Sequence, residues 1–113
     1  MDKKSLADIN DIVVKFVKEL GKKGIRPKEI ILYGSYASGK ADKWSDIDLI
    51  VISEDFAKIL PLDRLTLLSY AAWPLQAGVE AQGYTPQEIA ERGRDSILWE
   101  EIQNNHKVLY KAA

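Results

Sequence analysis

The sequence predicts a mixed α/β domain of the α+β type, in which a small mixed β-sheet packs against helices. Amphipathic segments with apolar residues every three or four positions alternate along the chain with short β-branched runs. Hydrophobic residues make up 46% of the 113 residues and charged residues 29%, as in ordinary globular proteins. The length suits a single core, so we expect one domain over residues 1–113.

The first expected element is a helix that Ser5 caps. Its apolar positions recur with helical spacing, and Gly21 and Gly24 are expected to stop it. These positions are Leu6, Ile9, Ile12, Val13, Phe16, Val17 and Leu20. Such a stripe predicts that the helix packs on the sheet.

Two strands should follow, over residues 30–33 and 46–52. Both segments are short and apolar, and the second ends at the polar residues 53–55. The charged segment 40–45 between them fits an exposed loop.

A second helix is expected over residues 61–72, closed by Trp73-Pro74. It would connect the strand of residues 46–52 to a short strand within 77–84. Thr85 and Glu88 then form the pattern of a capping box, with Pro86 at the first helical position. Asp95 can cap a further helix over 96–103 after Gly93, and residues 106–110 suggest a last strand. We find no repeat, linker or low-complexity segment.

Two aspartates stand at the start of the second strand. Because side chains of a strand alternate between its faces, Asp46 and Asp48 should share a face, with Ile47, Leu49 and Val51 on the other. Two nearby carboxylates repel each other unless a cation neutralises them, and magnesium prefers such oxygen ligands. A solvated surface pair is the simpler alternative.

The dipeptide Gly34-Ser35 follows the first strand, and ten residues separate Ser35 from Asp46. Glycine allows close approach to a ligand, and the serine hydroxyl can reach a phosphate oxygen. A helical turn over residues 35–38 would aim free amides at the same place, and Gly39 would let the chain turn out again. An ordinary turn is the alternative to this phosphate site.

A phosphate site beside a magnesium-binding aspartate pair suits phosphoryl or nucleotidyl transfer. Gly34, Ser35, ten residues and Asp46-x-Asp48 resemble the signature of the DNA polymerase beta-type nucleotidyltransferase superfamily, and more narrowly the minimal nucleotidyltransferases of bacteria and archaea. The resemblance implies the nucleotidyltransferase fold, ATP as a substrate and two magnesium ions. It implies that Asp46 and Asp48 are catalytic metal ligands and that Gly34 and Ser35 bind the nucleotide.

That superfamily usually has a third carboxylate on a later strand. Glu80 is the only acid on the short strand within 77–84, so we assign it this role, as general base or second-metal ligand. Aspartate is commoner at this place in the family, and glutamate has a longer reach. An exposed strand carboxylate without a role is the alternative.

The turn also departs from the family pattern. Many minimal nucleotidyltransferases have arginine between the alanine and glycine of this loop, where the present chain has Ser38. Lys43, or Lys40, could supply positive charge to the nucleotide instead, although both also fit a solvated loop.

Composition and charge argue against several classes of binding surface and site. A net charge of -1 argues against an extensive nucleic-acid surface, and the absence of cysteine excludes disulfides and thiolate metal sites. No long apolar stretch or signal-like start is present, so we expect no membrane association and a cytoplasmic location.

The aromatic residues are expected to be mainly structural. Trp44 could stack on a base but more simply covers a core edge. Trp73, Trp99 and Tyr110 should extend the core or form a subunit contact, so a homo-oligomer is one expectation. His106 is the single histidine, which is too little to argue for metal binding, and a position in a loop or at a strand edge is simpler.

Two hypotheses about function follow. In the first, the chain transfers AMP from ATP to a hydroxyl acceptor and releases pyrophosphate. The chain has no room for an acceptor-binding domain, so the acceptor should lie on another protein. The resemblance implies a small helical HEPN-type partner, as in toxin–antitoxin pairs. In the second, the chain is an antitoxin-like binding module that neutralises such a partner by contact, with an idle catalytic site.

Overall fold

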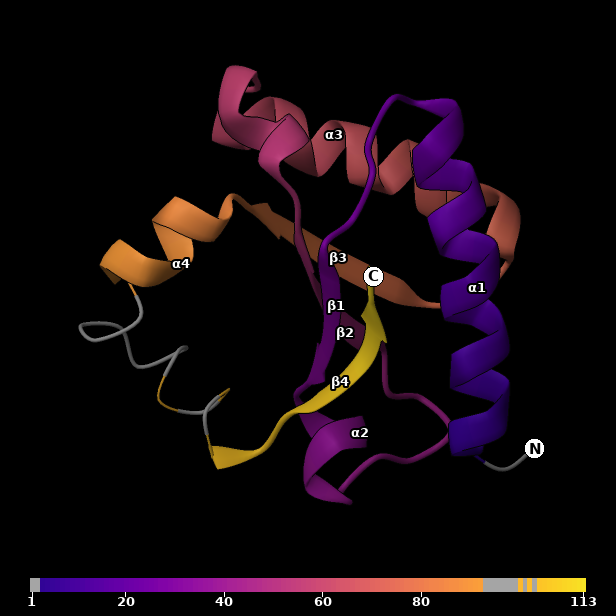
Figure 1. Cartoon of the computed structure of the whole chain (residues 1–113). Helices are drawn as coiled ribbons and strands as arrows, with labels where there is room; N and C mark the ends of the chain where they lie inside the picture. The colour runs from indigo at the N-terminus through magenta and orange to yellow at the C-terminus, as the bar shows by residue number, and fades with distance from the viewer. Residues whose placement is uncertain (1–2, 93–99, 101, 103) are drawn as a thin grey trace.

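A four-stranded mixed sheet with the order β3-β2-β1-β4 lies at the centre of the computed structural model (Figure 1). Strand β1 is antiparallel to both of its neighbours, whereas β2 and β3 are parallel. The strands are β1 (Glu29–Tyr33), β2 (Ile47–Ile52), β3 (Val79–Tyr84) and β4 (Lys107–Lys111). The structure describes residues 3–92, 100, 102 and 104–113. The mixed sheet packed with helices confirms the predicted fold class.

Helix α1 (Leu6–Lys22) has the predicted N-cap. The Asp8 amide donates to Ser5 Oγ at 3.1 Å, and the Ser5 amide donates to Asp8 Oδ2 at 3.0 Å. The prediction that Gly21 stops the helix is wrong, because Gly21 still lies within it. Gly24 ends the turn instead, with a φ of 82° that favours glycine.

Helix α3 (Pro61–Ala72) has the predicted bounds. It follows the short helix η1 (Glu54–Lys58) and continues into η2 (Trp73–Leu75). Because parallel strands cannot be joined by a tight turn, this helical crossover is what allows β3 to lie beside β2 in the same direction. The expected connection between the two strands is therefore confirmed.

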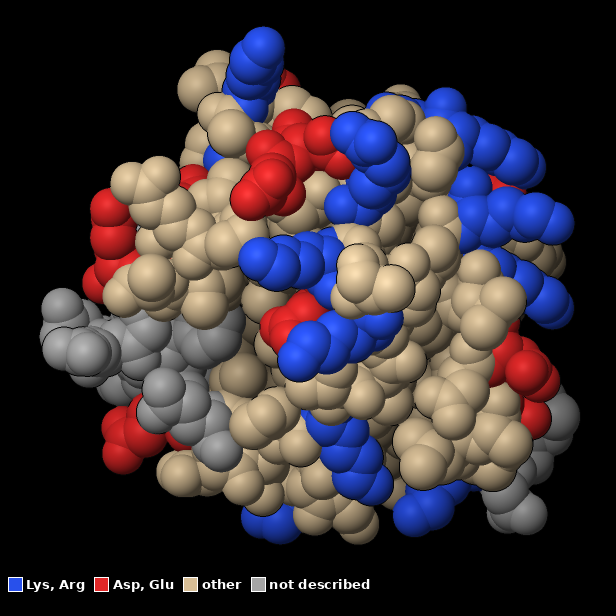
Figure 2. Space-filling view, in the orientation of Figure 1, with Lys and Arg blue, Asp and Glu red and all other residues tan. Residues whose placement is uncertain are grey.

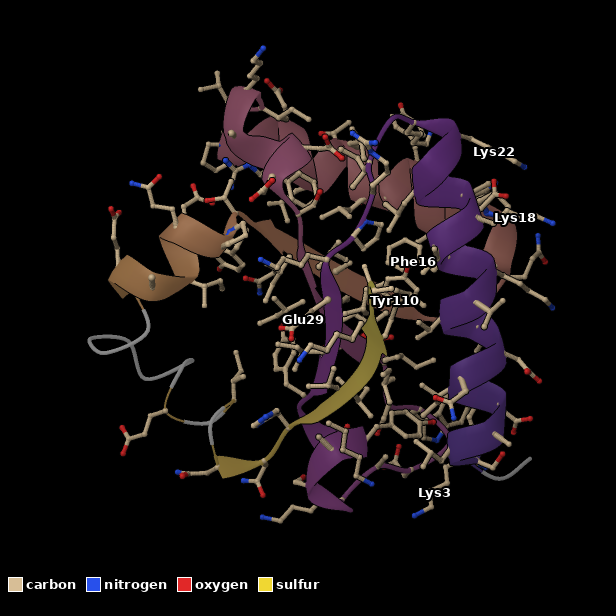
Figure 3. The ribbon with its side chains drawn as sticks, viewed as in Figure 1. Lys3, Phe16, Lys18, Lys22, Glu29 and Tyr110 are labelled. Atoms are coloured by element: carbon tan, nitrogen blue, oxygen red, sulfur yellow. The ribbon has the colours of Figure 1, made fainter. Side chains whose placement is uncertain are left out.

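Helices α1 and α3 cover one face of the sheet. Phe16 points from α1 toward the sheet, near Tyr110 of β4, while Lys18 and Lys22 point away from it (Figure 3). The buried side chains of this face come from both helices and from alternate strand positions. They include Ile9, Val13, Phe16, Leu20, Ile30, Leu32, Ile47, Leu49, Val51 and Leu68.

The other face of the sheet has a smaller buried cluster. Its members are Ile31, Tyr33, Ile50, Ile52 and Ile102, with Tyr84 and Ile89 packed against them. Ile89 belongs to α4 (Pro86–Arg92). Since side chains alternate along β2, Asp48 lies on the same face as this smaller cluster, opposite Ile47 and Leu49.

The predicted cap of α4 is present. The Glu88 amide donates to Thr85 Oγ1 at 3.1 Å, and the Thr85 amide donates to Glu88 Oε1 at 2.8 Å. The predicted helix over 96–103 and its Asp95 cap lie largely outside the described residues. The last strand is confirmed, but it begins at Lys107 and leaves His106 outside, exposed to solvent.

Two tryptophans do not lie where they were expected. Trp44 is 81% exposed and Trp73 is 80% exposed, so neither covers a core edge or extends the core. Tyr110, by contrast, packs against the larger core as expected. Trp99 lies outside the described residues, and the homo-oligomer stays a prediction.

Charge is unevenly spread over the surface. On the face shown in Figure 2, lysine and arginine side chains gather over the later part of α1, and acidic side chains lie among the basic ones elsewhere. No helix in the described part of the chain is long and apolar enough to cross a membrane.

Candidate active site

The predicted site residues come from elements that meet at one end of the sheet. Strand β1 ends at Tyr33, helix α2 (Ser35–Ser38) follows at once, and β2 starts beside them (Figure 1). Asp48 is the antiparallel partner of Tyr33 on one side and the parallel partner of Glu80 on the other. Facing residues on adjacent strands project to the same side of a sheet, so the fold brings Asp48 and Glu80 together.

Gly34 lies directly against the Asp48 carboxylate. Its backbone has a φ of 73° and a ψ of -153°, a conformation that few residues other than glycine adopt. A Cβ atom at this position would overlap Asp48 Oδ2. Glycine is therefore required here by both backbone conformation and space.

The predicted helical turn after Gly34 is confirmed. The amides of Ala37 and Ser38 both donate to the Gly34 carbonyl at 3.0 Å. The amides of Ser35 and Tyr36 come before these, and the first amides of a helix have no acceptor within it. Gly39 ends the turn with a φ of 80°, as expected.

The serine that replaces the family's arginine turns back on its own helix. Ser38 Oγ donates to the Ser35 carbonyl at 3.3 Å. This hydroxyl therefore contributes to the local turn, and it carries no charge for a phosphate.

Asp46 comes one residue before β2 and is exposed. Gly78 supports it from the start of β3: a Cβ on Gly78 would lie 2.8 Å from Asp46 Oδ1. The backbone is fastened at the same point, because the Ile47 amide donates to the Gly78 carbonyl at 2.6 Å. Gly78 was missed by the sequence analysis, and its only signal was a glycine before a short strand.

The three carboxylates have different surroundings. Asp48 is partly buried between two strands, whereas Asp46 and Glu80 are exposed, the latter on the edge strand. In the described part of the chain, no three acidic or histidine side chains converge closely enough to form a ready-made metal site. The donor set nevertheless suits a hard divalent cation, because it consists of carboxylate oxygens, two of them backed by glycine rather than by apolar side chains.

Tyr33 is a further polar residue of the site that the sequence analysis did not single out. Its hydroxyl accepts a hydrogen bond from Gln82 Nε2 at 3.2 Å, and the Tyr84 hydroxyl donates to Gln82 Oε1 at 2.8 Å. Burial raises the pKa of Tyr33 to about 12, and the charges of Asp48 and Glu80 add to the shift. Tyr33 therefore stays neutral at physiological pH and can donate a hydrogen bond.

A pocket of about 390 Å³ opens over the edge strand beside Glu80. Its polar lining includes Tyr33, Ser69, Glu80 and Gln82, and its apolar lining comes from Leu65, Leu68, Val79 and Ala81. The pocket therefore extends from α3 to the face of the sheet that carries Asp48 and Glu80, which we call the acidic face.

Lys43 is exposed in the loop before β2. Its ammonium lies 5.1 Å from the centre of the Trp44 ring, a contact within the loop. The structure thus pairs Lys43 with its neighbour in the loop.

Comparison of the sequence with known proteins gives the same family that the sequence motif resembles. A family model described as a nucleotidyltransferase domain matches residues 11–110. A candidate protein adenylyltransferase of Methanocaldococcus jannaschii is 38% identical over 63 residues, which are 53% of this chain and 72% of that protein.

Solved structures share the fold at lower identity. A candidate nucleotidyltransferase of Sulfolobus solfataricus superposes with a TM-score of 0.62 at 17% identity, over 96% of this chain and 90% of that one. A toxin–antitoxin structure with AMP-PNP gives 0.58 at 22% identity, over 91% and 73%. A complex of the tri-AMPylated Shewanella oneidensis HEPN toxin with its MNT antitoxin gives 0.55 at 21% identity, over 94% and 71%.

Proposed function

The chain belongs to the family of nucleotidyltransferase domains, and from this premise we propose that it transfers AMP from ATP to a hydroxyl group on a partner protein. The observation that carries the proposal is the register of the strands. Asp48 stands between the Gly34 turn and Glu80, so a nucleotide at the turn and an acceptor at the edge strand would meet at the same carboxylate.

Each residue has a proposed role in this reaction. Asp46, Asp48 and Glu80 would hold two magnesium ions, which when bound neutralise the phosphate charge. Ser35 and the first amides of α2 would bind triphosphate oxygens, with Gly34 allowing close approach. Lys43 would add positive charge from its loop once it leaves Trp44.

The chemistry is a single displacement at the α-phosphorus of ATP. The acceptor oxygen forms the new bond to phosphorus, and the bond from phosphorus to the oxygen bridging toward the β-phosphate breaks. Pyrophosphate leaves with the electron pair, and the acceptor proton passes to the Glu80 carboxylate. Glu80 would therefore combine metal binding with proton transfer, and the aspartates would serve metal binding alone.

We propose a small helical HEPN-type protein as the acceptor. Support comes from the solved complexes, one of which contains a tri-AMPylated HEPN toxin with an MNT antitoxin. The chain would act in the cytoplasm as one domain, with the acceptor hydroxyl supplied entirely by the partner.

Mass measurement tests this proposal. The purified chain is incubated with ATP, magnesium and a small helical HEPN-type protein as the proposed partner, and we expect that protein to gain about 330 Da for each AMP unit. Asp46→Asn and Asp48→Asn should abolish the gain, while Asp11→Asn, the same change on the exposed part of α1, should not. Full transfer by either aspartate variant would overturn the catalytic assignment.

The contact hypothesis remains a second candidate because Ser38 replaces the family's arginine and is hydrogen-bonded within its own turn. It predicts that the wild-type chain forms a stable complex with the helical protein and transfers no AMP. In that case Asp46→Asn and Asp48→Asn would neutralise the partner as well as the wild type does. Size-exclusion chromatography together with the mass measurement separates the two functions.

A further inference from the structure

The side chain of Tyr33 reaches from its own strand over β2 to β3. Tyr33 stands on β1, where its partner on β2 is Asp48, yet its hydroxyl bonds to Gln82 on β3 at 3.2 Å. The ring therefore passes over β2 on the acidic face. Its hydroxyl is delivered to the edge strand, on the side that also carries Glu80, two residues before Gln82.

The direction of these hydrogen bonds leaves the Tyr33 proton available. Tyr84 donates to Gln82 Oε1, which turns the Gln82 amide group toward Tyr33, and the Tyr33 oxygen accepts from that amide. A hydroxyl has one proton and can both accept and donate. The proton of Tyr33 is thus not used by Gln82.

Tyr33, Gln82 and Glu80 line the same pocket. From this shared lining and the bond to Gln82 we propose that Tyr33 is a positioning residue: its hydroxyl, held by Gln82, donates to the Glu80 carboxylate and fixes the direction of that group. The inference rests on the proposed transfer of AMP and refines it. A hydrogen bond to one oxygen of the carboxylate leaves the other oxygen for the acceptor hydroxyl. Tyr33 would thus act on Glu80 as an orienting group acts on the catalytic base in other enzymes.

The alternative is that the bond to Gln82 only holds the edge strand in place. Both roles predict some loss of stability when Tyr33 loses its hydroxyl. They differ in whether Tyr33 and Glu80 act on the reaction together, and a double-mutant cycle measures this dependence.

The experiment uses labelled ATP at a saturating concentration and the HEPN-type partner proposed above as the acceptor. The variants are Tyr33→Phe, Glu80→Gln and the double substitution, and Tyr70→Phe on the exposed part of α3 is the control. We expect Tyr33→Phe to lower kcat by about tenfold. The Kd for ATP should stay unchanged, and Tyr33→Phe should have little further effect in Glu80→Gln. Tyr70→Phe should leave all of these values unchanged.

A second cycle covers the case in which Glu80→Gln is too slow to measure. Glu80→Asp keeps a carboxylate but draws it back by one methylene, away from the Tyr33 hydroxyl, so its effect on kcat should overlap with that of Tyr33→Phe rather than multiply with it. Multiplicative effects in the measurable cycle, or wild-type kcat in Tyr33→Phe, would overturn the positioning role and leave the proposed function intact. A wild-type chain that transfers no AMP would overturn both.

Discussion

Two glycines determine where the aspartate side chains of the site can lie. Gly34 stands against Asp48 and Gly78 against Asp46, and at both positions an added Cβ would come too close to a carboxylate oxygen. The missing side chains therefore allow the backbone to approach the two carboxylates that we propose as magnesium ligands.

Replacement of Gly34 by alanine should damage both fold and site. The positive φ disfavours any other residue, which costs about 1–3 kcal/mol, and the new methyl group would push Asp48 aside. We expect a lower free energy of unfolding in urea and loss of AMP transfer. Unchanged activity in Gly34→Ala would show that Asp48 does not need its present position.

Replacement of Gly78 by alanine should impair the site while leaving the stability of the fold almost unchanged. The new Cβ would meet only the mobile end of Asp46, so the free energy of unfolding should change by less than about 0.5 kcal/mol. Displacement of Asp46 should weaken magnesium-dependent ATP binding by about tenfold, measured by calorimetry.

Gly21→Ala is the matched control for both glycine variants. Gly21 lies within α1 with no atom near an added Cβ, so alanine should raise the free energy of unfolding by about 0.5–1 kcal/mol and leave ATP binding unchanged. Weaker ATP binding in this variant would mean that the effects of Gly34→Ala and Gly78→Ala are not local.

Among the elements, those with local signals were predictable from the sequence. The Ser5 and Thr85 caps and the bounds of α3 depend on neighbouring residues, and the structure confirms them. The shared face of Asp46 and Asp48 stays a prediction, because β2 begins at Ile47 and strand alternation applies only from there on. Features that depend on a single element could therefore be predicted from the sequence without knowledge of the fold.

Contacts between distant elements could not be predicted in the same way. The register of Asp48 with Glu80 depends on how α3 returns the chain, and the support of Asp46 by Gly78 depends on that register. Exposure of Trp44 and Trp73 is likewise set by which surfaces the helices leave uncovered. No pattern within a single segment contains this information.

Arg64 joins four elements through one buried side chain. It is 5% exposed and donates to the carbonyls of Ile59 and Phe56, each at 2.8 Å, to the Gly83 carbonyl at 3.3 Å and to Glu88 Oε1 at 2.6 Å. Helix α3 is thereby fastened to η1, β3 and α4.

Arg64→Met should therefore destabilise the protein strongly. It removes the ion pair with Glu88 and the hydrogen bonds that Arg64 donates to three carbonyl groups, and loss of one partner of a buried ion pair costs about 3 kcal/mol. Urea unfolding measures this loss. Arg26→Met removes an exposed arginine whose Nε lies 3.7 Å from Asp55, and it should cost less than about 1 kcal/mol. Equal losses in the two variants would contradict the role of Arg64.

At the scale of the whole molecule, the same ion pair gives stability a dependence on pH. The hydrogen bond from Arg64 lowers the pKa of Glu88 below its usual 4.5; burial opposes this effect, and the Thr85 amide adds to it. A depressed folded-state pKa contributes stability that is complete above the unfolded-state value and is lost as the pH falls through the folded-state value.

The wild type should accordingly be more stable than Glu88→Gln at neutral pH. This difference in the free energy of unfolding should shrink as the pH falls below about 4.5. Urea titrations at several pH values measure it. In Arg64→Met, the pH-dependent difference caused by substitution of Glu88 should become smaller, because only the Thr85 contacts still lower the pKa of Glu88. A difference of undiminished size there would contradict the assigned cause.

The parallel pairing of β2 with β3 has a consequence for the folding of this chain. Asp48 and Glu80 become neighbours only after the crossover through α3 has closed, and such long-range pairing tends to form late and slowly. A partly folded chain that has formed α1, β1 and β2 would have both aspartates but no complete site. Recovery of enzymatic turnover during refolding would then report the pairing of β3 with β2, and a newly made chain would not consume ATP before this pairing has formed.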